Sequence, residues 1–145
     1  IILSGDKQTL VALSNDLKVE KKRSIFLPVS APFHCTLMKP AAERMKLFLE
    51  KTNFKTPNIQ IISNVTALPV EKDGNIKDLL YKQIFSTVRW RETLVNISNN
   101  DISNFIEIGP GKVLSGMVKR TLKNANSFSI NSITDIKNLI NEFKK

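Results

Sequence analysis

Hydrophobic and polar residues follow two spacings along this chain, one typical of helices and one typical of strands. Apolar residues at i, i+3, i+4 and i+7 predict helices with one apolar face, in the ranges 6–17, 38–52, 76–84, 88–97, 113–122 and 134–143. Short apolar runs between them predict strands, at 1–4, 24–29, 59–65, 105–108 and 127–131. This succession of strands and helices predicts an α/β fold.

Polar residues mark the expected helix ends and turns. Asp6 begins the first predicted helix, and Thr134 is the predicted N-cap of the last, because a side-chain oxygen there accepts a hydrogen bond from a free backbone amide. Asp73-Gly74 is a turn signal within the loop 66–75.

The main break in the apolar pattern follows the run 24–29 and contains His34, the only histidine of the chain. Pro28 and Pro32 flank this break, and each biases its predecessor toward extended backbone. A stiff, non-helical turn before a helix holds an imidazole in one place, as a general base requires. His34 is therefore the candidate catalytic residue; the alternative is a packed or surface histidine.

Two amide side chains are further candidates. Gln83 falls on the apolar face of the helix 76–84, where an unpaired amide is costly and needs a partner. Asn64 ends the run 59–65, and α/β folds place ligand contacts at the carboxyl ends of strands. The alternatives are an amide bonded to backbone at Gln83 and a strand-terminating turn residue at Asn64.

Gly109-Pro110-Gly111 joins a predicted strand to a predicted helix. A helix N-terminus in this position can bind phosphate. The pattern is neither Gly-x-Gly-x-x-Gly nor a P-loop, so it gives little support to nucleotide binding. We expect these glycines to let backbone segments pass close to one another.

Composition excludes several classes of protein. A length of 145 residues, 41% hydrophobic and 24% charged, fits one moderate globular domain or a piece of a larger one. The apolar runs are too short to span a membrane.

Cys35 is the only cysteine, which excludes an internal disulfide and a cysteine-cluster metal site and favours a reducing, cytoplasmic compartment. Neighbouring residues of an extended turn point in different directions, so a Cys35–His34 dyad is not expected.

The net charge is +9, from 22 basic and 13 acidic residues. The basic residues are spread out, and the few aromatic residues are not interleaved with them as a single-strand stacking platform requires. The charge indicates either a solvated lysine-rich surface or a field that steers an anionic partner. Charge is the only support for a nucleic-acid-binding domain.

Two segments resemble signatures of the malonyl-CoA:acyl carrier protein transacylases, a group that includes the acyltransferase domains of polyketide synthases. Segment 28–41, PVSAPFHCTLMKPA, is similar to the one that carries the family's catalytic histidine. Segment 106–116, IEIGPGKVLSG, looks like the family's second C-terminal signature. The family's nucleophilic serine lies upstream in Gly-His-Ser-x-Gly, and no Gly-x-Ser-x-Gly occurs here. The chain therefore resembles the C-terminal portion of such an enzyme.

The resemblance implies a fold and a division into domains. Residues 1–29 would be a strand, helix and strand that end a small ferredoxin-like subdomain. Residues 30–145 would be the C-terminal part of a large, α/β-hydrolase-like acyltransferase subdomain. The simple Lys144-Lys145 ending favours a standalone enzyme over a domain of a larger synthase.

The resemblance also implies a reaction, transfer of a malonyl group from malonyl-CoA to the phosphopantetheine thiol of acyl carrier protein in fatty acid biosynthesis. His34 would be the base that activates the upstream serine, and Gln83 would orient it through its side chain or its backbone carbonyl. Phe33 and Asn64 are the candidates for the substrate pocket. Phe33 is chosen because a Phe before the histidine accompanies malonyl specificity in related domains, and Asn64 because it ends a predicted strand. No metal and no cofactor are expected, because the coenzyme A thioester is a substrate.

Further expectations follow for partners. The expected partners are malonyl-CoA and acyl carrier protein, and no nucleic acid or membrane is expected. The full-length enzyme would be a monomer. Without the serine, this chain alone would be an inactive part of an S-malonyltransferase. The alternatives are an acyltransferase piece of a polyketide synthase and a non-catalytic module that binds the carrier protein.

Overall fold

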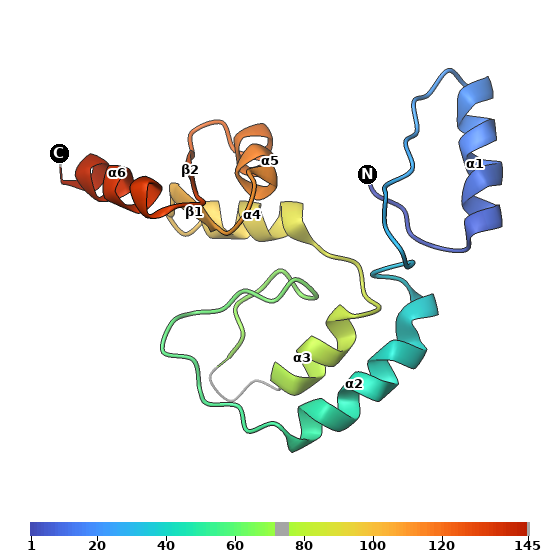
Figure 1. The fold of residues 1–145 in the computed structure, drawn as a ribbon, viewed down its shortest axis with the longest axis horizontal. Coiled ribbons are helices and arrows are strands. Elements are labelled where there is room, and N and C mark those ends of the chain that lie inside the picture. Colours follow the sequence, from blue (N-terminus) through green and yellow to red (C-terminus); the bar gives the residue numbers. More distant parts are fainter. Residues whose placement is uncertain (72–75, 145) are drawn as a thin grey trace. The chain divides into compact units, whose positions relative to one another are not determined.

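The structure, a computed structural model, describes residues 1–71 and 76–144. It forms two compact units, Ile1–Arg89 and Trp90–Lys145. The elements of the first are α1 (Lys7–Val19), a 3₁₀ turn η1 (Thr36–Met38), α2 (Lys39–Lys51) and α3 (Ile76–Gln83) (Figure 1). Those of the second are α4 (Trp90–Ser98), β1 (Asn104–Ile108), α5 (Val113–Thr121), β2 (Asn126–Ile130) and α6 (Ile133–Phe143). The six predicted helices are therefore confirmed.

Helix α1 begins where the sequence predicts, after Asp6, whose carboxylate caps it by accepting a hydrogen bond from the Thr9 backbone N–H at 3.0 Å. The segment after the helix runs back along it in Figure 1, and the Ser14 and Ser24 hydroxyls meet at 2.8 Å. The strands predicted at 1–4 and 24–29 are wrong, because neither segment belongs to a ladder among the described residues. A strand needs a neighbour that takes its backbone hydrogen bonds. The expected boundary between residues 29 and 30 stays a prediction.

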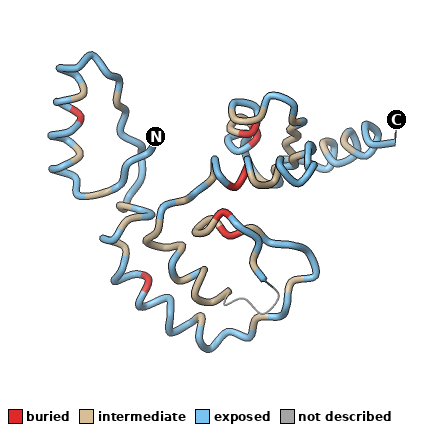
Figure 2. Tube along the Cα trace, turned by 180° about the vertical axis from the view of Figure 1, so that it is seen from behind, coloured by how far each residue is buried: buried red, intermediate tan, exposed pale blue. Residues whose placement is uncertain are grey.

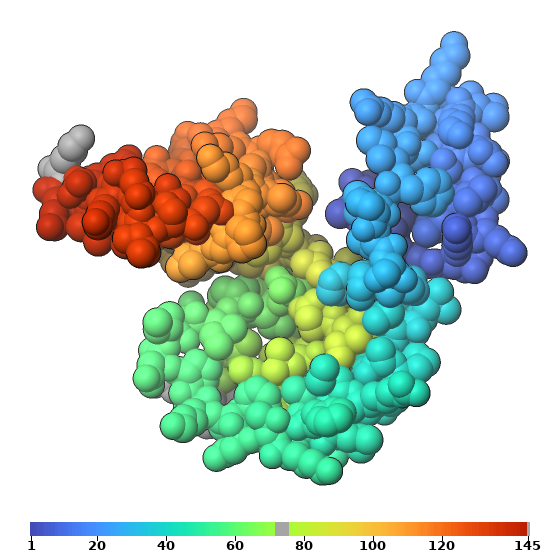
Figure 3. All heavy atoms as spheres, in the orientation of Figure 1, coloured from blue at the N-terminus to red at the C-terminus, as the bar shows by residue number. Residues whose placement is uncertain are grey.

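Helices α2 and α3 pack against each other, as the atoms of the two helices show in Figure 3. Pro40 lies in the first turn of α2, where its missing N–H breaks no helical bond, and Ala42 is completely buried. Met45 and Phe48 lie on the predicted apolar face but are 46% and 68% exposed. The α2–α3 contact thus covers only part of that face.

The strand predicted at 59–65 is also wrong. This region forms a tight turn closed by one antiparallel bridge between Ile62 and Pro69. Within the turn, Ala67 N–H donates to the Ser63 carbonyl at 2.8 Å. A β-branched run becomes a strand only beside a partner, and here the chain folds back on itself instead. The turn predicted at Asp73-Gly74 lies outside the described residues.

The second unit is a parallel β1–α5–β2 crossover with α4 and α6 packed against it. Residue Asn104 pairs with Asn126 and Ile108 with Ile130, so both strands lie where the sequence predicts them. Leu94 of α4 and Val118 of α5 are buried, and the rings of Phe128 and Phe143 lie 5.6 Å apart. The prediction that Thr134 caps α6 is wrong. The N-cap is Ser132, whose hydroxyl accepts a hydrogen bond from the backbone N–H of Asp135.

Few residues are buried, as the sparse red segments in Figure 2 show. The buried hydrophobic residues of the described chain are Ala42, Ala67, Leu94 and Val118. On the two-stranded sheet, Ile106 and Ile108 share a face with their partners Phe128 and Ile130 and are 46% and 82% exposed. Parallel sheets normally bury both faces. The β1 half of this face, at Ile106 and Ile108, is therefore apolar surface that the described residues leave largely uncovered, whereas Phe128 packs against Phe143 of α6.

Candidate active site

His34 lies on irregular backbone between two prolines and the start of η1, and its side chain is exposed. Its φ is +61°, in the left-handed region that non-glycine residues seldom adopt. Hydrogen bonds between residues close in sequence shape the turn around it. Phe33 N–H donates to the Ala31 carbonyl at 2.9 Å, and Met38 N–H donates to the Cys35 carbonyl at 3.0 Å. A strained residue of this kind persists where the surroundings fix it and often marks a functional site.

The imidazole of His34 meets the backbone of Gln83, with 3.0 Å between Nδ1 and the Gln83 carbonyl oxygen. A carbonyl oxygen only accepts hydrogen bonds, so Nδ1 carries the proton and donates it. The Nε2 lone pair is then free to accept a proton from another group. The predicted proximity of Gln83 to His34 is therefore observed, through the backbone and not the side chain.

The Gln83 side chain is placed differently. Its amide nitrogen is buried and has no hydrogen-bond partner among the described residues. Leaving a buried amide unpaired costs about 1–3 kcal/mol. The partner that the sequence requires for this amide is not supplied by the part of the chain that the structure describes.

The other two predicted residues lie apart from this contact. Phe33 precedes His34 on the same turn and is 45% exposed. Asn64 lies in the 63–68 turn, where its backbone carbonyl accepts a hydrogen bond from Arg89 N–H at 3.0 Å. No described hydrogen bond joins either residue to His34 or Gln83, so their role in a substrate pocket stays a prediction.

Cys35 is half-buried, and its thiol donates to the Pro32 carbonyl at 3.2 Å. The thiol is therefore engaged within its own turn. Among residues 1–71 and 76–144, no group of three metal-ligating side chains gathers that could hold a metal ion. In the same ranges, none of the helices is long and apolar enough to cross a membrane.

The Gly109-Pro110-Gly111 turn in the second unit leads into a helix N-terminus that is already occupied. Glu107 accepts hydrogen bonds from the backbone N–H groups of Leu114, at 3.1 Å, and Ser115, at 2.8 Å. The Ser115 side chain, followed by these backbone amides, lowers the pKa of Glu107 below its usual 4.5. The Glu107 carboxylate thus occupies the backbone N–H groups that a phosphate would need, so the role of this turn is structural.

This role of Glu107 was not predicted from the sequence; the signal that could have identified it is a charged residue inside an otherwise apolar strand. Two more side chains hold the turn at Gly111. The Ser129 hydroxyl donates to the Gly111 carbonyl at 2.7 Å, and Gly111 N–H donates to the Asn131 side-chain oxygen at 2.7 Å. The φ values of Gly109 and Gly111 are +135° and +102°, which only glycine adopts without strain. The expectation that these glycines let backbone segments pass close to one another is wrong in the described residues, because a Cβ at Gly109 or Gly111 would meet no atom within 4 Å. Their positive φ, and not close packing, is what favours glycine here.

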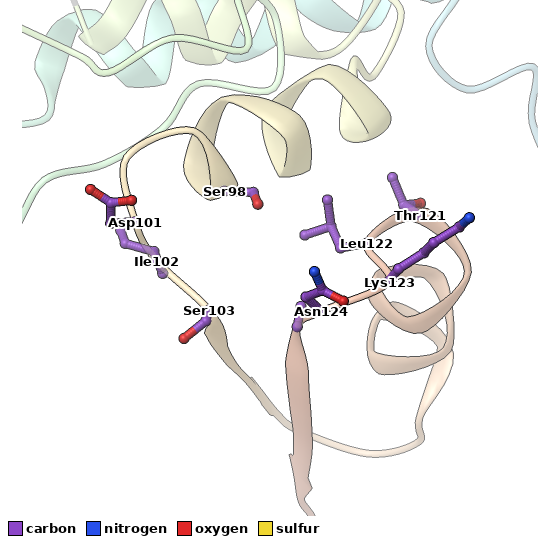
Figure 4. A pocket seen from close by; sticks show the side chains of 9 residues that line it. Ser98, Asp101, Ile102, Ser103, Thr121, Leu122, Lys123 and Asn124 are labelled. Atoms are coloured by element: carbon purple, nitrogen blue, oxygen red, sulfur yellow. The ribbon is translucent and has the colours of Figure 1, made fainter.

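The second unit also holds an open hollow of about 400 Å³. It lies between the residues that follow α4 and those that follow α5, at the ends where β1 and β2 begin (Figure 4). Ligand sites of parallel sheets lie at the opposite, carboxyl ends of the strands. The hollow contains none of the predicted site residues, and nothing in its lining points to a substrate.

Comparison with known proteins identifies relatives along the whole chain. No protein-family model matches it. The malonyl CoA-acyl carrier protein transacylase of Bacillus subtilis is 38% identical over 147 residues, which cover 100% of this chain and 46% of the relative. That of Buchnera aphidicola is 37% identical and covers 99% of this chain and 46% of the relative.

Solved structures agree with the sequence comparison. The malonyl CoA-acyl carrier protein transacylase of Clostridium perfringens superposes with a TM-score of 0.87 at 33% identity, over 93% of this chain and 43% of that one. A malonyl-transacylase in complex with its type II polyketide synthase acyl-carrier protein gives 0.88 at 31% identity, over 95% and 45%. These likenesses confirm the α/β fold.

The chain spans less than half the length of the curated relatives that it matches. This share agrees with the C-terminal portion that the two sequence signatures indicate. By sequence and by fold, the chain is thus a homologue of the malonyl CoA-acyl carrier protein transacylases and corresponds to less than half of such a protein.

Proposed function

We propose that this chain supplies the general base of a malonyl-CoA:acyl carrier protein S-malonyltransferase. The observation that carries the proposal is the hydrogen bond from His34 Nδ1 to the Gln83 carbonyl, which leaves Nε2 free to accept a proton. A general base needs this tautomer and a fixed ring. The Bacillus subtilis and Clostridium perfringens relatives, whose names state the activity, support the choice of reaction.

The proposed reaction has two acyl transfers. In the first, His34 Nε2 takes the proton from a serine hydroxyl, which the family carries in a segment without a counterpart here, as the oxygen attacks the thioester carbonyl of malonyl-CoA. The carbon–sulfur bond breaks, and the imidazolium returns the proton to the departing coenzyme A sulfur. In the second, His34 takes the proton from the carrier protein's thiol, which attacks the malonyl ester, and then returns it to the serine oxygen.

Gln83 would keep the ring in place during both transfers, and Phe33 and Asn64 remain the candidates for the substrate pocket. Malonyl-CoA and acyl carrier protein would be the partners, consistent with the relative that was solved with its carrier protein. We further propose a cytoplasmic, monomeric full-length enzyme that uses no cofactor or metal.

The intact mass after incubation with malonyl-CoA tests this function. We would compare this chain alone with the chain joined to the region that carries the serine in a relative. A malonyl adduct on the longer protein only, lost when its serine is changed to alanine, supports the proposal. An adduct on this chain alone would overturn it and point first to Cys35.

A second candidate is a non-catalytic module that binds an acidic carrier protein through basic surface, favoured by the net charge of +9. It predicts carrier binding that weakens with salt and survives His34→Ala, with no malonyl adduct on either protein. An adduct on the longer protein that is lost in its His34→Ala variant would exclude it.

A further inference from the structure

The packing of α2 against α3 is fixed by polar side chains at both ends of the contact. At one end, the Tyr81 hydroxyl donates a hydrogen bond to the Glu43 carboxylate at 2.5 Å. At the other, Lys77 Nζ donates to the Glu50 backbone carbonyl at 3.0 Å. The two helices are antiparallel, so the first bond lies near the start of α2 and the end of α3.

The Tyr81 end is the one that carries the histidine contact. Gln83 is the last residue of α3, two positions after Tyr81, and His34 precedes the start of α2 by five positions. The Gln83 carbonyl can stay on His34 Nδ1 only while the end of α3 keeps its place beside the start of α2. The Tyr81–Glu43 bond joins these two parts directly.

Neighbouring side chains hold Tyr81 in the orientation that this bond needs. Its ring packs edge-on against Phe85, with 5.2 Å between ring centroids, and Lys46 Nζ lies 5.7 Å from the Tyr81 ring centroid. The hydrogen bond to Glu43 raises the pKa of the Tyr81 phenol above its usual 10.0, so the hydroxyl remains the donor at neutral pH. Tyr81 is half-buried, and Glu43 is exposed.

We propose that Tyr81 is a positioning residue for His34: its hydroxyl, bonded to Glu43, keeps the Gln83 carbonyl on Nδ1 and so maintains the Nδ1–H tautomer. The consequence for catalysis rests on the proposed function, whereas the effect on the tautomer does not. Gln83 and His34 make the contact, and Tyr81 acts only through them.

The only histidine of the chain makes a direct measurement possible, because selective ¹⁵N-histidine labelling gives the signals of one imidazole. We would read the tautomer ratio by NMR in the full chain and in Tyr81→Phe, which keeps the ring and removes the hydroxyl. We expect the ratio of Nδ1–H to Nε2–H to fall about fivefold, as the loss of one hydrogen bond of about 1 kcal/mol predicts.

The matched control is Lys77→Met, which removes the bond at the far end of the same helix pair. It should leave the tautomer ratio unchanged. Glu43→Ala is the second variant for the near end: it should reproduce the fall, and the double variant with Tyr81→Phe should add nothing to it. Glu43 is exposed, so its truncation should leave α2 and α3 folded even if Tyr81→Phe folds poorly.

Two results would overturn the proposal: an unchanged tautomer ratio in Tyr81→Phe and Glu43→Ala, or an equal fall in Lys77→Met, which would assign the effect to helix packing in general. In an active enzyme that includes the serine segment, Tyr81→Phe should lower kcat about fivefold with KM unchanged. A fall in the tautomer ratio together with no malonyl transfer by the unaltered enzyme would contradict the proposed function and leave the positioning role established.

Discussion

The two signature segments of this chain are built in opposite ways. The first, around His34, is irregular backbone whose key side chain reaches a carbonyl 49 positions away. The second, around Gly109 and Gly111, is a strand, a turn and a helix start, tied together by the Glu107 carboxylate, which reaches 8 positions to Ser115, and by the Ser129 hydroxyl, which reaches 18 positions to Gly111. One segment presents a reactive group, and the other holds a turn in shape.

The backbone makes the same distinction. Both segments contain residues with positive φ, but in the second they are glycines, which pay no steric cost there, while in the first the residue is His34 itself. Positive φ also occurs at Lys21, Ala67 and Asp101, outside both segments. Between the two segments, strain is found where chemistry is proposed and is avoided at the structural turn. This agrees with the general placement of strained residues at functional sites.

The largest effect is expected on malonyl transfer, from removal of the His34 side chain in the first segment. His34→Ala should lower kcat/KM for malonyl transfer by about 10²–10⁴-fold, the usual contribution of a general base, in the enzyme that includes the serine segment. Its thermal melting should not change, because the side chain is exposed. Thr36→Ala, also exposed on this turn, is the control and should keep full activity. Full activity of His34→Ala would show that the base lies elsewhere.

The next effect concerns the stability of the second segment. Gly111→Ala should lower the free energy of unfolding by about 1–3 kcal/mol, because alanine is strained at a φ of +102°. A Cβ at this position would meet no atom within 4 Å, so the cost is conformational. Gly116→Ala, inside α5 and equally free of contacts, should instead raise it by about 0.5–1 kcal/mol. Denaturant unfolding of both variants measures the contrast, and equal signs would refute it.

A smaller effect depends on pH. Glu107→Gln should lower Tm by a few degrees at pH 7, because the helix N-terminus loses its carboxylate. The pKa of Glu107 is lowered in the folded state, so its contribution is complete above the usual 4.5 and is lost as the pH falls through the lower, folded value. Melting curves from pH 7 to pH 3 should therefore converge for the two proteins. Glu142→Gln on exposed α6 is the control, and parallel curves for Glu107→Gln would contradict the assignment.

The smallest effect tests the strain at His34. His34→Gly should change the free energy of unfolding by no more than about 1 kcal/mol, because relief of the left-handed backbone is offset by the greater freedom of glycine in the unfolded chain. A loss of 2 kcal/mol or more on denaturant unfolding would mean that the imidazole, and not only the backbone, stabilises the first unit.

The sequence predicted the helices well and the strands unevenly, for one physical reason. A helix completes its hydrogen bonds within itself, whereas a strand depends on a partner. The runs 105–108 and 127–131 find each other and form β1 and β2. The equally apolar runs 1–4, 24–29 and 59–65 find no strand among the described residues and do not become strands.

The candidate site was predictable to a similar extent. Segment 28–41 identified His34, and the apolar helix face singled out Gln83. The atom that makes the contact was not predictable, because the choice between an amide and a carbonyl depends on how α3 ends. The Tyr81–Glu43 contact joins residues from different elements, and no sequence pattern predicts it. For the Glu107–Ser115 contact, the sequence shows only a charged residue inside an apolar strand, which does not identify its partner.

The ties of α3 to α2 and to His34, which precedes α2, also imply an order in time. They join residues that are 27, 38 and 49 positions apart, from Lys77–Glu50 through Tyr81–Glu43 to His34–Gln83. Contacts between nearer residues close smaller loops and form sooner. The hairpin should therefore close from its loop toward its open end, with the histidine contact forming last and opening first. The contact of His34 would then be the last of these three to form after synthesis, and brief opening at that end would release the imidazole while the rest of the helix pair stays folded.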